Sequence, residues 1–288
     1  MLIAGALGSA CGSDDAAPAA TGGSGGSGAR EGGASGGSSG SGGTGASLGS
    51  GGSRDASPDT PVEDGIYEIQ EIRDGSVFVG VEVRVQKVFV TAAKRTPSGA
   101  VNLVVQEPQG ETKNGHPYPE YAGVSVFMAP EDGGPEPMLA AIGDCVDVTG
   151  SLSEFQNKTQ IERAEVTPAT GCGTAPMPFA ITATKFAAIA SDTNPNQEGD
   201  QAGPDAEPFE SVLLRLDAVR ALTAPLAQGG LFQVALQSKP TGEAIWVDDF
   251  YFRVPATPNQ NYASFTGVFS QGANYVLLPR SAADAVTQ

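Results

Sequence analysis

Apolar and polar residues alternate strictly from Phe78 to Gln86, and one face of this segment is formed by four valines, Val79, Val81, Val83 and Val85. A period of two over this length predicts a half-buried β-strand. The alternation slips by one residue at Gln86-Lys87 and resumes at Val88, which predicts a β-bulge. Because a bulge bends a strand, this first strand can take part in two sheets at once, as a small closed barrel requires.

Nine further stretches have the length and composition of strands and are separated by turns rich in Gly and Pro. They are Val101–Gln106, Gly123–Met128, Cys145–Leu152, Thr159–Val166, Val212–Ala221, Leu231–Leu236, Ala244–Val247, Ala263–Phe269 and Tyr275–Pro279. A short helix is predicted at Thr184–Ala190, between the two series of strands. Five strands in about a hundred residues predict a small barrel or sandwich rather than a βαβ fold.

The two series of strands correspond to one another. Phe78–Val81 aligns with Phe209–Val212 at an offset of 131 residues, and Thr149–Leu152 aligns with Thr266–Phe269 at an offset of 117. The first series is therefore 14 residues longer between these points. This pattern predicts a tandem duplication with a loop insertion in the first copy, at 107–121 or at 131–137.

Several motifs of these strands resemble the OB-fold modules of bacterial secreted proteins. The first copy has a "vQ" strand at Val105-Gln106, a "Gi-vf" strand at Gly123–Phe127 and a "GD-V-VtG" strand at Gly143–Gly150, and Tyr275–Ser281 resembles the end of such a module. The resemblance covers residues 66–287 and implies an all-β chain with two tandem OB-like five-stranded barrels. Such modules accompany extracellular nucleases and occur in surface lipoproteins, but the motifs are core and turn positions, which imply a fold and not an activity.

The first sixty residues differ in composition from the rest. The segment Thr21–Ser53 contains 16 glycines among mostly Ser, Ala and Thr, and it cannot bury enough apolar surface to fold, so we expect a disordered tether. Ahead of it, an apolar run ends in small residues before Cys11, and this resembles a bacterial lipoprotein signal, which is cleaved before the cysteine and acylated on its thiol. The expected divisions are a signal at 1–11, a tether at 12–63 and OB-like barrels at 64–176 and 177–288.

Charge bears on the choice of partner. The whole chain has 33 acidic and 16 basic residues, of which the first sixty contribute five and two, so the remainder has 28 acids against 14 bases. This excess of negative charge repels phosphate, and the bases near the first barrel's loops are few: Lys113, Lys158 and Arg163. We therefore expect no tight nucleic-acid binding, and a partner that is an envelope protein or polymer.

After Cys11, the remaining cysteines are Cys145 and Cys172. Two thiols and the single histidine of the chain cannot complete a tetrahedral metal site. In an oxidising compartment such an even pair favours a disulfide, with two separate buried thiols as the alternative.

No catalytic constellation is present in the sequence, and no enzyme activity, metal or cofactor is expected. His116 is the only histidine, no Gly-x-Ser-x-Gly elbow occurs, and we interpret His116 as a solvent-exposed loop residue. In the same loop, Tyr118 and Tyr121 are candidates for stacking on a base or a sugar, and His116 beside them is a further candidate ligand-binding residue. Aromatic residues beside a barrel more often pack against it, and that alternative is favoured.

Two acidic segments were also considered as sites. Trp246 and Tyr251 flank Asp248 and Asp249, a combination that suits a sugar or a metal, but neighbouring carboxylates on a regular strand point to opposite faces. We expect Trp246 in the core. The segment Asp192–Asp200 places oxygen ligands at alternate positions but lacks the glycine and glutamate that define a calcium loop, so an acidic linker is favoured over a weak Ca²⁺ site.

Two functional interpretations follow. The first is a non-enzymatic, lipid-anchored envelope protein, in the outer membrane or at the cell surface, that presents the barrels for binding or structural roles. The second is an accessory module for nucleic acid or polysaccharide that acts with a secreted hydrolase. A local patch of basic and aromatic side chains on a barrel face would favour the second.

The anchoring hypothesis predicts that a palmitate analogue labels the full-length precursor through Cys11. The substitution Cys11→Ser is expected to abolish labelling and to release soluble protein, because it removes the thiol at the position that the signal marks for acylation. Equal labelling of the Cys11→Ser protein in a metabolic-labelling experiment contradicts the hypothesis.

Overall fold

The computed structural model describes residues 65–110, 115–130, 136–155, 158–192, 205–227, 230–238, 243–271 and 275–288. These residues all belong to one compact unit, 58–288. Cys11, the tether, Lys113 and residues 193–200 of the acidic segment lie outside the described residues, and what the sequence predicts for them remains a prediction.

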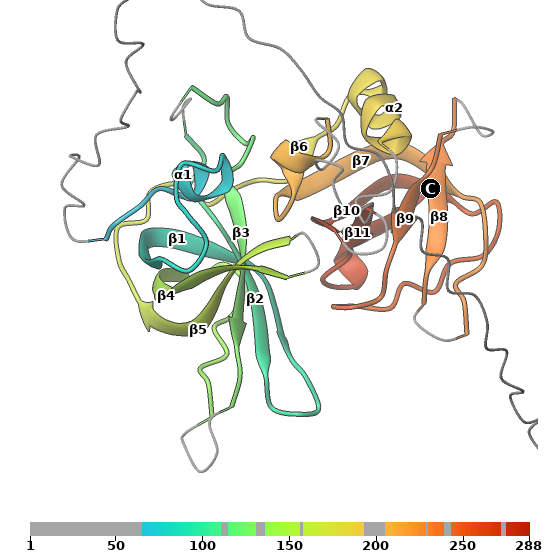
Figure 1. Ribbon diagram of the computed structural model, residues 1–288. Helices are drawn as coiled ribbons and strands as arrows, with labels where there is room; N and C mark the ends of the chain where they lie inside the picture. The colour runs from blue at the N-terminus through green and yellow to red at the C-terminus, as the bar shows by residue number, and fades with distance from the viewer. Residues whose placement is uncertain are drawn as a thin grey trace, which may run out of the picture. The chain divides into compact units, whose positions relative to one another are not determined.

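The first barrel is closed by five strands in the order β1-β2-β3-β5-β4 (Figure 1). β3 and β5 pair in parallel, and the other neighbours pair antiparallel. The strands are β1 (Glu82–Arg95), β2 (Val101–Gln106), β3 (Gly123–Met128), β4 (Cys145–Phe155) and β5 (Lys158–Pro168).

β1 bends as predicted and borders two strands. Its first part pairs with β4, and the register shifts between Val85 and Val88, where Lys87 has a φ of 55°. Its second part pairs with β2. The predicted start at Phe78 is wrong: β1 begins at Glu82, because Gly80 has a φ of 93° and turns the chain before it joins the ladder.

The second barrel repeats the same strand order, β7-β8-β9-β11-β10, and the β10–β7 pairing closes it. Here β9 and β11 are the parallel pair, at the positions of β3 and β5. The barrel strands are β7 (Leu213–Ala221), β8 (Phe232–Leu236), β9 (Ile245–Val247), β10 (Asn261–Gln271) and β11 (Tyr275–Leu278). The short strands β6 (Phe179–Ala180) and β12 (Ala285–Thr287) extend this sheet, and a 3₁₀ turn at Ala282–Asp284 precedes β12. Two closed five-stranded barrels confirm the predicted all-β, two-barrel fold class.

The register of the strands supports the duplication. Thr149 pairs with Arg84 in the first barrel, and Thr266 pairs with Arg215 in the second. The two arginines are 131 residues apart and the two threonines are 117 apart, so equivalent strands pair at both predicted offsets. The β2–β3 connection spans 107–122, whereas the β8–β9 connection spans only 237–244. The first of the two predicted loops therefore holds much of the additional length.

A helix precedes the first strand of each barrel. α2 (Ala183–Ser191) was predicted almost to its bounds, and it buries Phe186 and Ile189 in the core of the second barrel. α1 (Ile69–Arg73) was missed, because five residues are too few to show a period; its Ile69 N–H donates to Glu107 Oε1 at 2.7 Å, a contact distant in sequence. Among the described residues, no helix is long and apolar enough to span a membrane.

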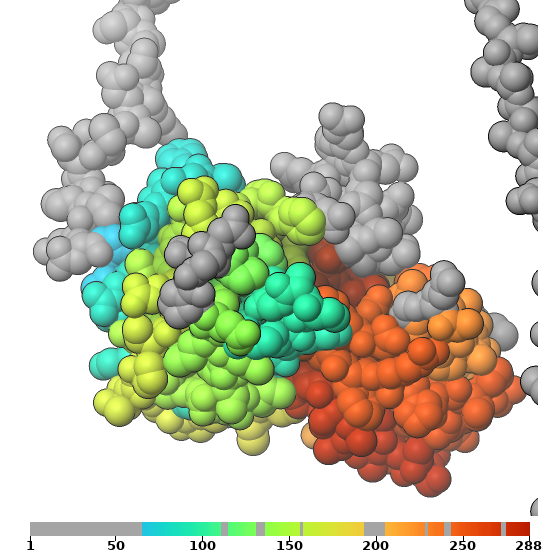
Figure 2. Space-filling model, turned by 90° about the horizontal axis from the view of Figure 1, so that it is seen from below, coloured from blue at the N-terminus to red at the C-terminus, as the bar shows by residue number. Residues whose placement is uncertain are grey.

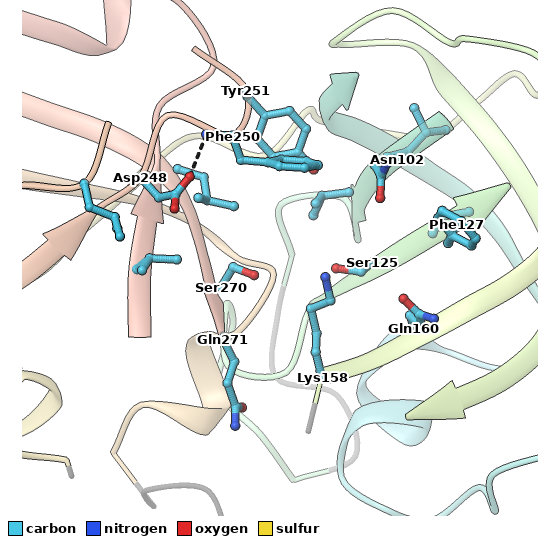
Figure 3. Close-up of a pocket in the computed structure, with 16 residues that line it drawn as sticks. Asn102, Ser125, Phe127, Lys158, Gln160, Asp248, Phe250, Tyr251, Ser270 and Gln271 are labelled. Atoms are coloured by element: carbon cyan, nitrogen blue, oxygen red, sulfur yellow. Dashed lines mark hydrogen bonds between the residues drawn. The ribbon is translucent and has the colours of Figure 1, made fainter. Parts of the chain in front are cut away.

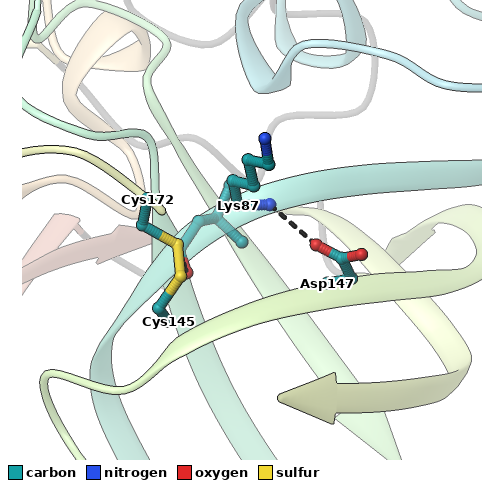
Figure 4. Close-up of a disulfide and its surroundings, with 5 residues drawn as sticks. Lys87, Cys145, Asp147 and Cys172 are labelled. Carbon is teal, nitrogen blue, oxygen red and sulfur yellow. Dashed lines mark hydrogen bonds between the residues drawn. A yellow bond between two sulfur atoms is a disulfide. The ribbon is translucent and has the colours of Figure 1, made fainter. Parts of the chain in front are cut away.

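The predicted disulfide is present. Cys145 at the start of β4 is bonded to Cys172, with a Cα–Cα distance of 5.9 Å, so the bond ties β4 to the segment that follows β5 (Figure 4). Near it, the Lys87 N–H donates to Asp147 Oδ1 at 2.9 Å and holds the bulge of β1 against β4. The bulge and the disulfide therefore stabilise the same end of the barrel.

Each barrel has its own apolar core, and a third, smaller cluster joins the two. Ala92 and Val104 on the outside of the first barrel pack there against Leu213 and Val268 of the second, and Figure 2 shows residues of the two barrels in contact. At Gly123 the backbones of the two barrels approach closely. A Cβ on Gly123 would lie 2.0 Å from the carbonyl oxygen of Ser211, so no other residue fits without moving the barrels apart.

We expect Gly123→Ala to lower the free energy of unfolding by more than about 2 kcal/mol, because the atoms that the new Cβ would meet are backbone atoms of Ser211 and Val212 and cannot rotate away as a side chain can. Gly110→Ala is the matched control, since neither glycine has a positive φ and the nearest atom to a Cβ on Gly110 is 3.5 Å away. Its effect should stay within about 0.5 kcal/mol in urea unfolding. Equal stabilities for the two variants would show that the close approach is not required.

Candidate ligand-binding site

A cavity of about 350 Å³ lies over the outer face of β2, β3 and β5, and residues of both barrels line it (Figure 3). The alternation of each strand sets which side chains reach it: Leu103 and Val105 of β2 fill the barrel core, so Asn102 points outward. The first barrel contributes polar and aromatic side chains, namely Asn102, Ser125, Phe127, Lys158 and Gln160.

The second barrel forms the opposite wall with the turn that follows β9. There the Phe250 N–H donates to Asp248 Oδ1 at 2.7 Å, which closes the turn, and the rings of Phe250 and Tyr251 meet edge to face at 4.9 Å between centroids. Lys94 of β1 donates to the Phe250 carbonyl and lies 4.6 Å from the centroid of its ring. The turn is thereby fixed to the first barrel. Ser270 and Gln271 at the end of β10 complete the wall.

Burial shapes the electrostatics of this cavity. It lowers the pKa of Lys158, an effect that the carboxylate of Glu210 opposes, and it raises the pKa of Asp248, against the hydrogen bond from Phe250. Burial also raises the pKa of Tyr251 far above its usual value, so its phenol stays protonated at neutral pH. The lining therefore combines aliphatic side chains and aromatic rings with amides, hydroxyls, one lysine and one carboxyl group. Such a surface suits a flat, polar, hydrogen-bonding ligand.

The loop residues predicted as candidates do not line the cavity. His116 is partly buried, with Nε2 3.6 Å from Asp74 Oδ2 and its ring 4.6 Å from that of Tyr121. The Tyr121 N–H donates to the carbonyl of Pro208 in the second barrel at 2.6 Å. Tyr118 accepts a hydrogen bond from Gln106 Nε2 at 3.0 Å, and burial raises its pKa to about 12. These three side chains pack near the junction of the two barrels.

The other two predicted candidates, Trp246 and Tyr251, lie in different places. Tyr251 lines the cavity, whereas Trp246 does not and also lies outside both barrel cores. The expectation of a core position for Trp246 is wrong, because Ile245 and Val247 on either side of it face the core of the second barrel. β9 ends at Val247, so the two carboxylates that follow lie in a turn and not on a regular strand.

Sequence reasoning missed the residues of β2, β3 and β5 that line the cavity. Their outward position follows from the alternation of each strand, but only the structure shows that the second barrel covers them. Among the described residues, no group of three or more His, Cys, Asp or Glu side chains could hold a metal ion.

No protein-family model and no curated protein matches the chain. Solved structures do: a Replication Protein A heterotrimer bound to ssDNA has 15% identity over 37% of this chain and 82% of that chain, with a TM-score of 0.26. Fission yeast Pot1 with ssDNA has 9% identity over 75% and 84%, with a TM-score of 0.27. A structure described as structural mimicry for functional antagonism has 11% identity over 74% and 94%, with a TM-score of 0.30.

These TM-scores are too low for the likeness to assign a ligand to this chain. Two of these structures contain single-stranded DNA. The expectation that net charge makes nucleic acid an improbable partner is corrected on physical grounds. The physical reason is that charges beyond about 8–10 Å are screened at physiological salt, so the local charges at a site outweigh the total.

Gln106 is buried, and its side-chain amide links the second barrel to the loop between β2 and β3. Its Oε1 accepts a hydrogen bond from the Leu213 N–H at 3.0 Å, and its Nε2 donates one to the Tyr118 hydroxyl. We expect Gln106→Leu to lower the free energy of unfolding by about 1–3 kcal/mol, because it leaves a buried backbone N–H without an acceptor. Tyr118→Phe removes only one end of the network and should cost less. Urea unfolding of both variants tests this, and a Gln106→Leu protein as stable as wild type would contradict it.

Proposed function

We propose that this chain is a non-enzymatic binding module that takes a single-stranded nucleic acid in the cavity between its two barrels. The observation that carries the proposal is the position of the cavity, on the outer face of the second and third strands of a closed five-stranded barrel. This is the face on which OB-like barrels bind oligonucleotides and oligosaccharides.

The size of the cavity favours a single strand over a duplex. A volume of about 350 Å³ is enough for one base or sugar unit at a time and far too small for a double helix. Bases that are splayed from a single strand can enter such a space and stack on aromatic rings.

The lining offers the contacts that a base requires. Phe127 is partly exposed on β3 and presents a ring for stacking, and Asn102 and Gln160 present amides that donate and accept hydrogen bonds. Lys158 supplies a positive charge beside them. These residues come from three adjacent strands, so the barrel holds them in place before the ligand arrives.

The acidic total charge limits the phosphate contribution. Lys158 lines the cavity and Lys94 lies at its edge, so at most about two phosphates are neutralised there. Binding then rests mainly on stacking and hydrogen bonds, and its dependence on salt should be shallow.

The proposal also includes a cellular location for the protein. The Cys145–Cys172 disulfide fits an oxidising compartment, and the sequence before Cys11 supports a lipid anchor followed by a tether. In that setting, the barrels would bind their ligand outside the cytoplasm, beside a secreted hydrolase.

We expect a mixed-sequence oligonucleotide to bind saturably, and Phe127→Ala to weaken binding roughly 5- to 150-fold, because stacking on one ring contributes about 1–3 kcal/mol. The matched control is Phe155→Ala, on β4 of the same barrel; that side chain is 55% exposed and lies outside the cavity. Fluorescence titration measures both.

Salt and a competing ligand sharpen this test. The slope of log K against log salt should be no steeper than about −1.5, as expected for two phosphate contacts on a single strand. Equal loss in the Phe127→Ala and Phe155→Ala proteins would place binding elsewhere. Saturable binding of a neutral oligosaccharide, without any oligonucleotide binding, would show that the ligand is a polysaccharide and not a nucleic acid.

A further inference from the structure

A buried group of charges that does not itself line the cavity joins the two barrels. Arg73 ends α1 before the first barrel, and its side chain is 0% exposed. Its Nη2 lies 2.8 Å from Glu207 Oε1 and 2.9 Å from Glu210 Oε2. Both glutamates belong to the segment that leads into β7, Glu207 in a 3₁₀ turn (Glu207–Phe209) and Glu210 directly after it. This ion-pair cluster therefore ties one copy of the duplication to the other.

The cluster is incompletely satisfied. Two carboxylates share one guanidinium nitrogen, while Arg73 Nε and Nη1, Glu207 Oε2 and Glu210 Oε1 are buried without a hydrogen-bond partner. Removing charges from water is costly, and a buried pair offsets that cost only if its remaining polar atoms are bonded. The Glu210 side chain is 0% exposed, so it is the group least able to carry its charge here.

The charged groups that face Glu210 come from every element packed around it. Burial raises its pKa to about 7, the negative charges of Glu207 and of Glu154 on β4 act in the same direction, and Arg73 and Lys158 on β5 oppose them. Tyr121 lies in the field of Glu207 and Arg73 as well. Protonation of Glu210 removes the repulsion between the two carboxylates and leaves one balanced pair, Arg73 with Glu207.

We propose that Arg73, Glu207 and Glu210 form a proton-controlled latch between the barrels, which is tight when Glu210 is protonated and loosens when Glu210 ionises. The pKa of Glu210 is raised above its ordinary 4.5, so this stabilisation is complete below about pH 4.5 and is lost as the pH rises toward 7. Because the walls of the cavity come from both barrels and Lys158 is shared by cavity and cluster, a loosened latch also alters the cavity.

Two amides that cross the junction report on the latch without any ligand. The Leu213 N–H donates to Gln106 Oε1, and the Tyr121 N–H donates to the Pro208 carbonyl. After correction for the intrinsic pH dependence of hydrogen exchange, the opening constant at these amides should rise more than about tenfold from pH 5 to pH 7.5, relative to amides of the β1–β2 ladder.

The isosteric substitution Glu210→Gln should remove this rise and keep the junction closed across the whole range. The control Glu136→Gln changes the same charge on a side chain that is 78% exposed and should behave as wild type. An unchanged rise in Glu210→Gln, or no rise in wild type, overturns the proposal. Carbon-13 titration of the Glu210 carboxyl in wild type tests it even if the variant does not fold, since a midpoint near 4.5 would contradict it. These readouts need no oligonucleotide, so they are independent of the proposed function.

Discussion

The close approach of Gly123 to Ser211 constrains how the second barrel meets the first. The two backbones are so close that a Cβ on Gly123 has no room, and the Ser125 and Ser211 hydroxyls are hydrogen-bonded beside them at 3.1 Å. The second copy is thereby held against the outer face of β3. That face is where a barrel of this kind binds ligands, and the second copy covers part of it while leaving a cavity.

Several polar contacts cross the junction, as is common for interfaces between domains of one chain. Its apolar cluster is small, and the remaining contacts are hydrogen bonds and ion pairs, such as Gln106 with Leu213 and Arg280 Nη1 with the Thr91 carbonyl at 3.2 Å. Polar contacts fix a relative position because each requires its own partner, and unpaired buried groups are costly. An interface with few apolar contacts is also only weakly stabilised, so the ionisation of one buried side chain can shift the equilibrium between the closed and the open junction.

Most strands and the two barrels could be predicted from the sequence, whereas the contacts between segments distant in sequence could not. The bounds of β2 and β3, the bulge before Val88 and the disulfide depend on local alternation or on cysteine chemistry, and all were predicted. α1 depends instead on a hydrogen bond to Glu107, 38 residues away, and Arg73 pairs with Glu207 at a separation of 134 residues. Alternation shows that Asn102 faces outward, but no local pattern shows that the turn after β9 comes to lie opposite it.

The proposed ligand site is the surface between β2, β3 and the turn after β9. The most direct test follows the side-chain amide signals of Asn102 and Gln160 by NMR during titration with a single-stranded oligonucleotide. Both line the cavity, whereas Gln237 Nε2 donates to the Val219 carbonyl at 3.1 Å elsewhere in the second barrel and serves as the internal reference. We expect saturable shifts at Asn102 and Gln160 and none at Gln237. Binding that leaves the Asn102 and Gln160 signals unmoved would contradict it.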